Sequence, residues 1–162
     1  MLLGLAGVKS NDRIRVWPIQ GDREYPTLVQ IWRSAVDATH DFLAEDDRKS
    51  IEDNLIPHYF PAVELFGAEL DGTLVGFVGI AGRTVEMLFV DNEYRGRGIG
   101  TRLLEEAVSR HGARMVDVNE QNPGAVGFYR SYGFVTTGRD EIDADGKPYP
   151  TLHMRLEREP QS

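Results

Sequence analysis

Glycine and arginine alternate in the segment Arg95-Gly96-Arg97-Gly98-Ile99-Gly100-Thr101, which joins a strand-like run, Thr84 to Val90, to a helix-like stripe. Glycines at the start of a helix let successive backbone N–H groups face one concavity, and this concavity lies at the positive end of the helix dipole. Arg95 and Arg97 add positive charge and forked hydrogen-bond donors on the same side. The segment is therefore predicted to bind a phosphate group.

Two familiar phosphate-binding loops do not fit this segment. A P-loop needs a Gly-Lys-Ser/Thr sequence before its helix, and no lysine lies nearby. A dinucleotide-binding loop needs another glycine after Gly96 and Gly98, at the position where this chain has Thr101. Asp117 lies about where such a loop has its ribose-binding acid, but the glycines follow a predicted meander and not an opening strand. We therefore exclude both loops.

A third kind of loop matches. Two motifs carry the resemblance: Arg95-x-x-Gly98-x-Gly100, which resembles the coenzyme A pyrophosphate loop of the GNAT N-acetyltransferase superfamily, and Asn122-x-x-Ala125-x-x-x-Tyr129 with Gly133-Phe134, which resembles its fourth-helix signature. The resemblance extends over residues 13–156. Further stretches are similar to a narrower bacterial group, the YjaB-like acetyltransferases: residues 31–33 and 36–43, 118–122 and 146–150.

The resemblance implies acetyl-CoA as cosubstrate. In the superfamily, the strand before the loop separates from its neighbour, so that its backbone can bind the pantetheine arm, while the glycine loop holds the pyrophosphate. One asparagine, here Asn122, bonds the arm near its end. We accordingly expect these residues to contact the coenzyme: Leu88, Phe89, Val90, Arg95, Gly96, Arg97, Gly98, Ile99, Gly100, Thr101, Asn119 and Asn122.

The implied reaction moves an acetyl group to a primary amine by direct attack on the thioester, through a tetrahedral intermediate whose oxyanion needs a hydrogen-bond donor. Tyr129 resembles the residue that protonates the departing thiolate, because a tyrosine with a pKa of about 10 stays protonated at neutral pH. The base that deprotonates the amine stays open between Glu86, Asp117 and water. A non-catalytic module that binds acyl-CoA as a sensor or interaction domain is the alternative function.

The acceptor is expected to be cationic. His40 and Asp41 fall between the first two predicted helices, a region that shapes the acceptor site in GNAT folds, so they are candidate substrate-binding residues. The chain has 18 basic and 26 acidic residues and a net charge of −8. This charge favours a basic acceptor and argues against nucleic acid or an anionic membrane surface as a partner.

The spacing of apolar residues predicts the elements that position these groups. We expect strands over Arg13–Ile19 (ended by Pro18), Val63–Leu70, Leu74–Ile80, Thr84–Val90, Arg114–Val118, Phe134–Ile142 and Thr151–Leu156, and helices over Tyr25–Thr39, Glu45–Ile56, from Ile99 to Gly112, and from Asn122 to Gly133. Asp71-Gly72 predicts a two-residue hairpin turn. The order β-α-α-β-β-β-α-β-α-β-β indicates an α/β (α+β) fold with helices on both faces of a mixed sheet. The GNAT resemblance adds that the sheet has about seven, mostly antiparallel strands.

Composition sets the remaining limits. A chain of 162 residues with 41% hydrophobic residues is expected to form one domain, here residues 13–158, between a flexible N-terminal extension, 1–12, and a C-terminal tail, 159–162. It has no cysteine, which excludes disulfides, thiolate metal sites and a cysteine nucleophile. Its four scattered histidines predict no metal site. We expect a cytoplasmic protein, monomeric or homodimeric, that does not enter membranes.

Overall fold

The computed structural model describes residues 13–39 and 41–157; the expected extension, His40 and the C-terminal tail lie outside the described residues. One seven-stranded sheet runs through the molecule in the order β1-β2-β3-β4-β5-β7-β6. The strands are β1 (Ile14–Ile19), β2 (Glu64–Leu70), β3 (Thr73–Ala81), β4 (Thr84–Val90), β5 (Met115–Asn119), β6 (Phe134–Asp140) and β7 (Thr151–Leu156). The helices are α2 (Tyr25–Thr39), α3 (Glu45–Asn54), α4 (Ile99–Glu105) and α5 (Pro123–Tyr132).

The predicted order of elements and the mixed, mostly antiparallel sheet are confirmed. Only β4 and β5 pair in parallel among the described strands, and every other neighbouring pair is antiparallel. The predicted hairpin turn is present between β2 and β3. Asp71 and Gly72 both have positive φ, 51° and 86°, as a two-residue turn that matches the twist of its strands requires.

Some predicted boundaries were wrong. Pro18 lies inside β1 and does not end it. Among the described strands β1 is an edge strand whose partner is β2, and an edge strand tolerates a proline because its missing N–H can face away from the partner. The helix expected to run to Ile56 ends at Asn54 and continues as a π-helical turn, Leu55–Tyr59. The helix expected to run from Ile99 to Gly112 ends at Glu105 and continues as a π-helical turn, Glu106–Arg110. The strand expected to reach Ile142 ends at Asp140, and Ile142 is an exposed residue beyond it.

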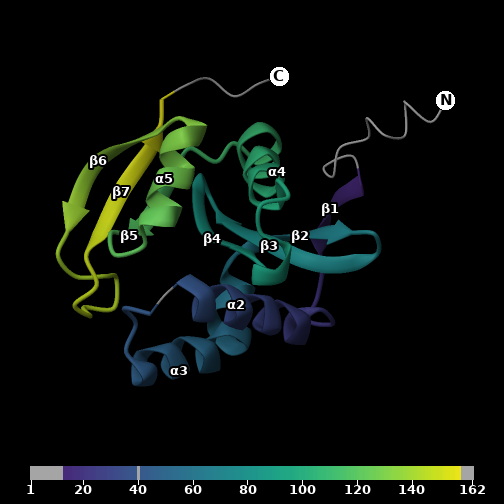
Figure 1. Ribbon diagram of the computed structural model, residues 1–162, viewed down its shortest axis with the longest axis horizontal. Coiled ribbons are helices and arrows are strands. Elements are labelled where there is room, and N and C mark those ends of the chain that lie inside the picture. The colour runs from purple at the N-terminus through teal and green to yellow at the C-terminus, as the bar shows by residue number, and fades with distance from the viewer. Residues whose placement is uncertain (1–12, 40, 158–162) are drawn as a thin grey trace.

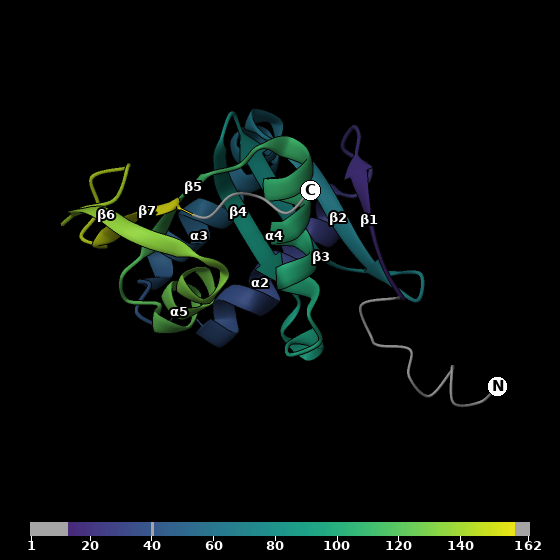
Figure 2. The same ribbon diagram turned by 90° about the horizontal axis from the view of Figure 1, so that it is seen from above.

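Helices cover both faces of the sheet (Figure 1). On one face, α4 and α5 contribute to a hydrophobic cluster that includes Leu103, Leu104 and Val126. On the other face, α2 buries Leu28 and Trp32 in a second cluster. Seen from above, β1 and β6 lie at opposite ends of the sheet, with α4 over its central strands (Figure 2). In the part of the chain that the structure describes, no helix is long and apolar enough to cross a bilayer.

The sheet opens between its two parallel strands. Pairing of β4 with β5 is limited to Thr84 with Met115 and Val85 with Val116. Beyond these pairs β4 stays paired with β3 as far as Val90, whereas β5 stays paired with β7. The facing edges of β4 and β5 therefore carry backbone groups that no strand satisfies.

Candidate active site

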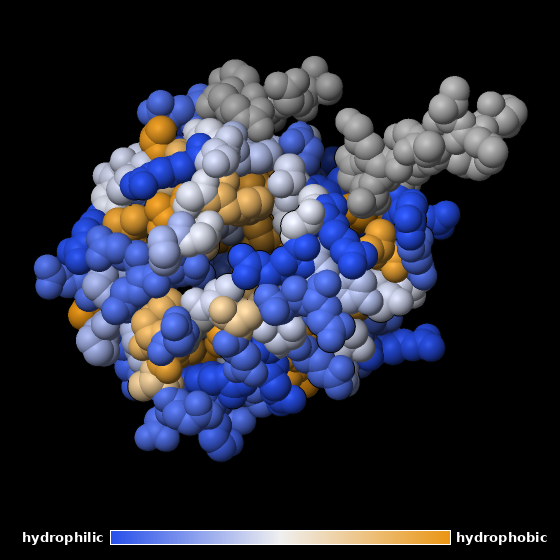
Figure 3. Space-filling model, in the orientation of Figure 1, coloured by the Kyte–Doolittle hydropathy of each residue, from blue (hydrophilic) through white to orange (hydrophobic). Residues whose placement is uncertain are grey.

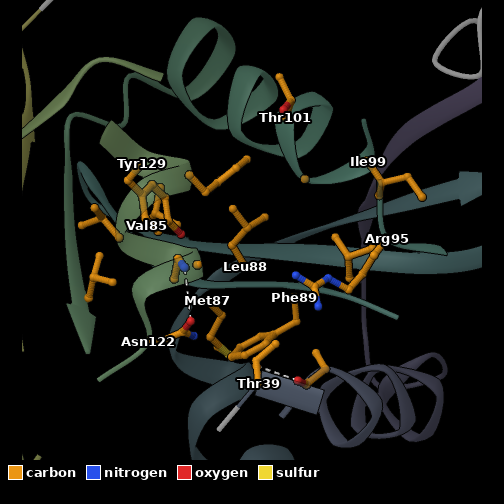
Figure 4. Close-up of a pocket in the computed structure, with 18 of the residues that line it drawn as sticks. Thr39, Val85, Met87, Leu88, Phe89, Arg95, Ile99, Thr101, Asn122 and Tyr129 are labelled. Atoms are coloured by element: carbon orange, nitrogen blue, oxygen red, sulfur yellow. Dashed lines mark hydrogen bonds between the residues drawn. The ribbon is translucent and has the colours of Figure 1, made fainter. Parts of the chain in front are cut away.

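A cleft of about 450 Å³ occupies the space where β4 and β5 separate. On the molecular surface, apolar side chains line a hollow between α4 and α5 (Figure 3). In close-up, Tyr129 lies on one side of the cleft and Arg95 on the other, with Leu88 between them (Figure 4). The lining residues come from β4 (Val85–Val90), the following loop and α4 (Asn92, Tyr94–Gly96, Gly98–Thr101), β5 (Val116–Asn119), α5 and its cap (Asn122, Gly124, Ala125, Phe128, Tyr129) and α2 (Ala35, Thr39).

The glycine turn borders one side of this cleft. Gly96 and Gly98 have φ values of +76° and +82°, which only glycine adopts without strain, and Gly98 is the residue that precedes α4. Apart from the chain neighbours of each glycine, no heavy atom of the described residues lies within 4 Å of the position that a Cβ would take on either residue. The turn thus leaves the first N–H groups of α4 beside open space, where the positive end of the helix favours an anion.

Tyr129 borders the opposite side. Its ring packs edge-on against Phe128 and Phe134, with centroid distances of 5.1 and 5.6 Å, and the residue is 7% exposed. This burial raises the pKa of Tyr129 well above its ordinary value, because the phenolate would lose its water. Tyr129 therefore stays a proton donor throughout the neutral range.

Two asparagines shape the end of the cleft near α5. Asn122 is the N-cap of α5, as its sequence predicts: its Oδ1 accepts a hydrogen bond of 3.2 Å from the N–H of Ala125. Asn119 Oδ1 accepts a hydrogen bond of 2.8 Å from the N–H of Gln121. Both side chains are therefore held at the edge of the cleft.

Two carboxylates lie where β4 and β5 part. The β3–β4 register pairs Gly79 with Met87 and Ile80 with Val85, so Glu86 is the extra residue of a β-bulge. Burial raises the pKa of the Glu86 carboxyl, and the nearby charge of Asp117 raises it further. Asp117 lines the cleft from β5.

A second cavity, of about 540 Å³, lies against the other face of β4. Glu86, Met87 and Phe89 line both cavities, so Glu86 stands at their boundary. The rest of its lining is mainly apolar, with one further carboxylate, and comprises Trp32, Val36, Leu43, Ile51, Leu55, Tyr59, Ala62, Val63, Ala81 and Asp145.

The structure brings together nearly all the site residues expected from the sequence. The three candidate catalytic residues and every candidate coenzyme contact except Arg97 line the first cavity. The guanidinium of Arg97 lies 5.3 Å from the centroid of the Tyr94 ring instead. Asp41 lines neither cavity, and His40 lies outside the described residues. Among the described residues, no cluster of histidine and acidic side chains is arranged to hold a metal ion.

Sequence reasoning missed the second cavity and one side-chain cluster. In the cluster, His153 of β7 lies between Asp117 of β5 and Asp140 of β6, with each ring nitrogen 2.7 Å from a carboxylate oxygen. The alternation of β7, in which Leu152 and Met154 are buried, could have placed His153 on the face opposite the core. No local pattern predicts its two partners.

Comparisons with known proteins identify the family and the fold of this chain. The acetyltransferase (GNAT) domain family matches residues 37–158. Peptidyl-lysine N-acetyltransferase YjaB of Escherichia coli K12 is 46% identical over 129 residues, which are 78% of this chain and 86% of YjaB. The solution structure of apo-form YjaB from Escherichia coli has a TM-score of 0.80 at 40% identity, and the match covers 89% of this chain and 97% of that one. The PaiA N-acetyltransferase of Thermoplasma acidophilum in complex with coenzyme A has a TM-score of 0.66 at 21% identity over 88% of this chain and 99% of PaiA, a likeness of fold alone. The chain belongs to the GNAT acetyltransferase family.

Proposed function

We propose that this protein is an acetyl-CoA-dependent N-acetyltransferase that acetylates a primary amine, with the lysine side chain of a protein or peptide as its acceptor class. The cleft between β4 and β5 is the observation that carries the proposal, because it has an anion-binding turn on one side and a buried phenol on the other. The name of YjaB, a peptidyl-lysine N-acetyltransferase, supports the choice of acceptor.

The described residues fit coenzyme A. Open space at Gly96 and Gly98 leaves room for a pyrophosphate, and Arg95 supplies a positive charge beside it. The unpaired edge of β4, from Leu88 to Val90, would bind the amides of the pantetheine arm, with Asn119 and Asn122 near its end. Bound acetyl-CoA supplies the acetyl thioester, and the residues described next act on the protons of the reaction.

Tyr129 is proposed as the general acid. Burial keeps its phenol protonated, and the residue lines the cleft, so its O–H can donate a proton to the sulfur as the thiolate departs. A thiol with a pKa of about 8.5 is already a fair leaving group, so this acid accelerates the reaction without being indispensable.

Glu86 is proposed as the general base. It stands at the boundary of the two cavities, where an amine in the second cavity would meet an acyl group in the first. Its raised pKa makes its carboxylate a stronger base than an ordinary glutamate. Asp117 is less suited to this role because its carboxylate is already hydrogen-bonded to His153.

The acceptor is proposed to enter through the second cavity. Apolar walls suit the aliphatic stem of a lysine, and the carboxylates of Glu86 and Asp145 suit its ammonium group. The net charge of −8 further favours a basic peptide. His40 and Asp41 stay candidate contacts for the part of the peptide outside the cavity.

Two measurements on the purified chain test this proposal. Saturating acetyl-CoA should raise the melting temperature by roughly 5 °C or more, as a ligand at a hundred times its Kd adds about 2.7 kcal/mol. A thiol-reactive dye then follows coenzyme A release with a lysine-containing peptide, and the protein adds no background because it has no cysteine. The matched control peptide has arginine in place of lysine, and both peptides are acetylated at the N-terminus so that the lysine is the amine under test.

Each outcome has a distinct meaning. Thiol release together with one acetyl group on the lysine peptide supports the proposal. A thermal shift without release across lysine peptides and small amines would instead indicate a coenzyme-binding module. If neither a thermal shift nor thiol release is observed, coenzyme A does not bind at this site.

A further inference from the structure

Three side chains from three neighbouring strands form one hydrogen-bonded cluster beside the cleft. Asp117 and His153 are direct partners in the β5–β7 register, and the Nδ1 of His153 lies 2.7 Å from Asp117 Oδ1. Its Nε2 lies 2.7 Å from Oδ2 of Asp140, on the strand at the other side of β7. Both ring nitrogens are therefore occupied by carboxylates, which fixes the orientation of the ring.

This arrangement fits a protonated ring. A neutral imidazole donates from one nitrogen only, whereas the imidazolium donates from both. The hydrogen bond to Asp117, and then that to Asp140, raises the pKa of His153 above its ordinary value. Two carboxylates and one imidazolium give the cluster a single net negative charge.

Other charged residues surround the cluster. Arg155 lies two positions along β7 on the same face of the strand. The charge of Asp117 raises the pKa of Glu86 on β4, and Asp145 of the β6–β7 loop lines the second cavity together with Glu86. On β6, Arg139 is engaged by Glu120, with a nitrogen–oxygen distance of 2.7 Å, and also by Glu141. His153 is thus the cation bonded directly to Asp117.

The cluster is too exposed to contribute much to folding. The side chains of His153, Asp117 and Asp140 are 38%, 59% and 65% exposed, and ion pairs at such positions add little stability. Its position points to another role, because Asp117 lines the same cleft as Glu86 and its charge acts on the Glu86 carboxyl.

We propose that His153 is a positioning residue for the reaction: bound between Asp117 and Asp140, it holds the Asp117 carboxylate at the edge of the cleft and supplies a positive charge that offsets the negative charge of Asp117 near Glu86. This proposal rests on the proposed function, in which Glu86 takes the proton of the amine. Without that charge, repulsion would keep Glu86 protonated to higher pH, and less of the base would be available.

Two variants that change the net charge of the cluster in opposite directions test the proposal. His153→Asn leaves two uncompensated carboxylates, so the pKa of Glu86 should rise by about 0.3–1 unit. Asp140→Asn removes one negative charge, so the same pKa should fall or stay unchanged at pH values where His153 is protonated. The double variant restores the single net negative charge and should bring the pKa of Glu86 back close to its wild-type value.

The pKa of Glu86 is measured by NMR on the full chain with labelled glutamate carboxyl carbons, so this readout does not need an active enzyme. The acidic limb of the pH dependence of kcat/KM for the lysine peptide should move in parallel. His111→Asn is the control, because His111 is also paired with a carboxylate, that of Glu106 at 3.2 Å, but lines neither cavity. It should change neither readout.

Two results would overturn the proposal: no change in the Glu86 titration in His153→Asn, or a rise in both single variants, which is the pattern of a purely structural disturbance. If the wild-type chain acetylates no amine, the proposed function fails instead. The NMR titration still decides whether His153 controls the charge at Glu86.

Discussion

Tyr149 donates a hydrogen bond from its phenol to Oδ2 of Asp47 and thereby joins the β6–β7 loop to the first turn of α3. The same phenolic oxygen accepts a hydrogen bond of 3.0 Å from the N–H of Ala44. Lys147 of the loop adds an ion pair, with its Nζ 3.1 Å from Asp47 Oδ1. Two segments a hundred residues apart are thus held together, and between them they supply Asp145 and Ile51 to the second cavity.

Tyr149→Phe should lower the melting temperature by about 2–4 °C, because it removes a hydrogen bond to a carboxylate at a buried ring. Hydrogen bonds from Tyr149 and Lys147 lower the pKa of Asp47, so the stabilisation is present above the unfolded pKa of about 3.9 and is lost as the pH falls through the lower folded value. The melting difference between wild type and variant should therefore be full at pH 6 and shrink below about pH 4. Lys147→Ala is the comparison, and its more exposed ion pair should change the melting temperature little. An undiminished difference at pH 3 would contradict the assignment.

Gly98→Val should abolish the thermal shift produced by acetyl-CoA. The substitution forces a branched side chain into a left-handed backbone conformation and places it where the pyrophosphate is proposed to bind. Gly21→Val is the matched control, because Gly21 also has a positive φ, +75°, and open space around its Cβ position but lines neither cavity. Both variants should lose comparable stability without ligand. Only the Gly98 variant should lose the thermal shift with acetyl-CoA. A preserved thermal shift in that variant would mean that the pyrophosphate binds elsewhere.

Local signals were sufficient for the parts of the molecule that short segments determine. Asn122-Pro123 predicted the start of α5, and its cap is present. The glycines before Ile99 predicted a turn into α4, and Gly98 has the left-handed φ that this turn needs. These features depend on residues only a few positions apart, so the sequence carries them directly.

The remainder depends on contacts between distant strands. The cleft begins after the pair Val85–Val116 because the register of two parallel strands ends there, and no motif marks that point. The cluster around His153 requires β5, β6 and β7 to lie side by side in a particular register. The sequence alone therefore could not rank Glu86 above Asp117 as the base, since the bond from Asp117 to His153 was not visible in it.

Tyr129→Phe should reduce kcat by about 10- to 100-fold and leave the thermal shift with acetyl-CoA unchanged, because only the proton donor is removed. Tyr132→Phe on the same helix is the control. Its phenol donates a hydrogen bond of 2.6 Å to Glu105, and Tyr132 lines neither cavity. The loss of this hydrogen bond should lower the melting temperature and leave kcat unchanged. Equal kcat for wild type and Tyr129→Phe with a good lysine peptide would remove Tyr129 from the mechanism.

Glu86→Gln should lower kcat/KM by about 100-fold or more near neutral pH and remove the acidic limb of its pH profile, because glutamine cannot take the proton of the amine. The same change should leave the melting temperature at pH 7 unchanged or slightly higher. Burial, with the charge of Asp117, raises the folded pKa of Glu86, so its ionisation opposes folding as the pH rises from the unfolded pKa of about 4.3 through the folded value. Asp117→Asn is the comparison: it keeps Glu86, removes the neighbouring charge and should move the acidic limb to lower pH without abolishing it. A loss of activity in Asp117→Asn as large as that in Glu86→Gln would instead assign the base to Asp117.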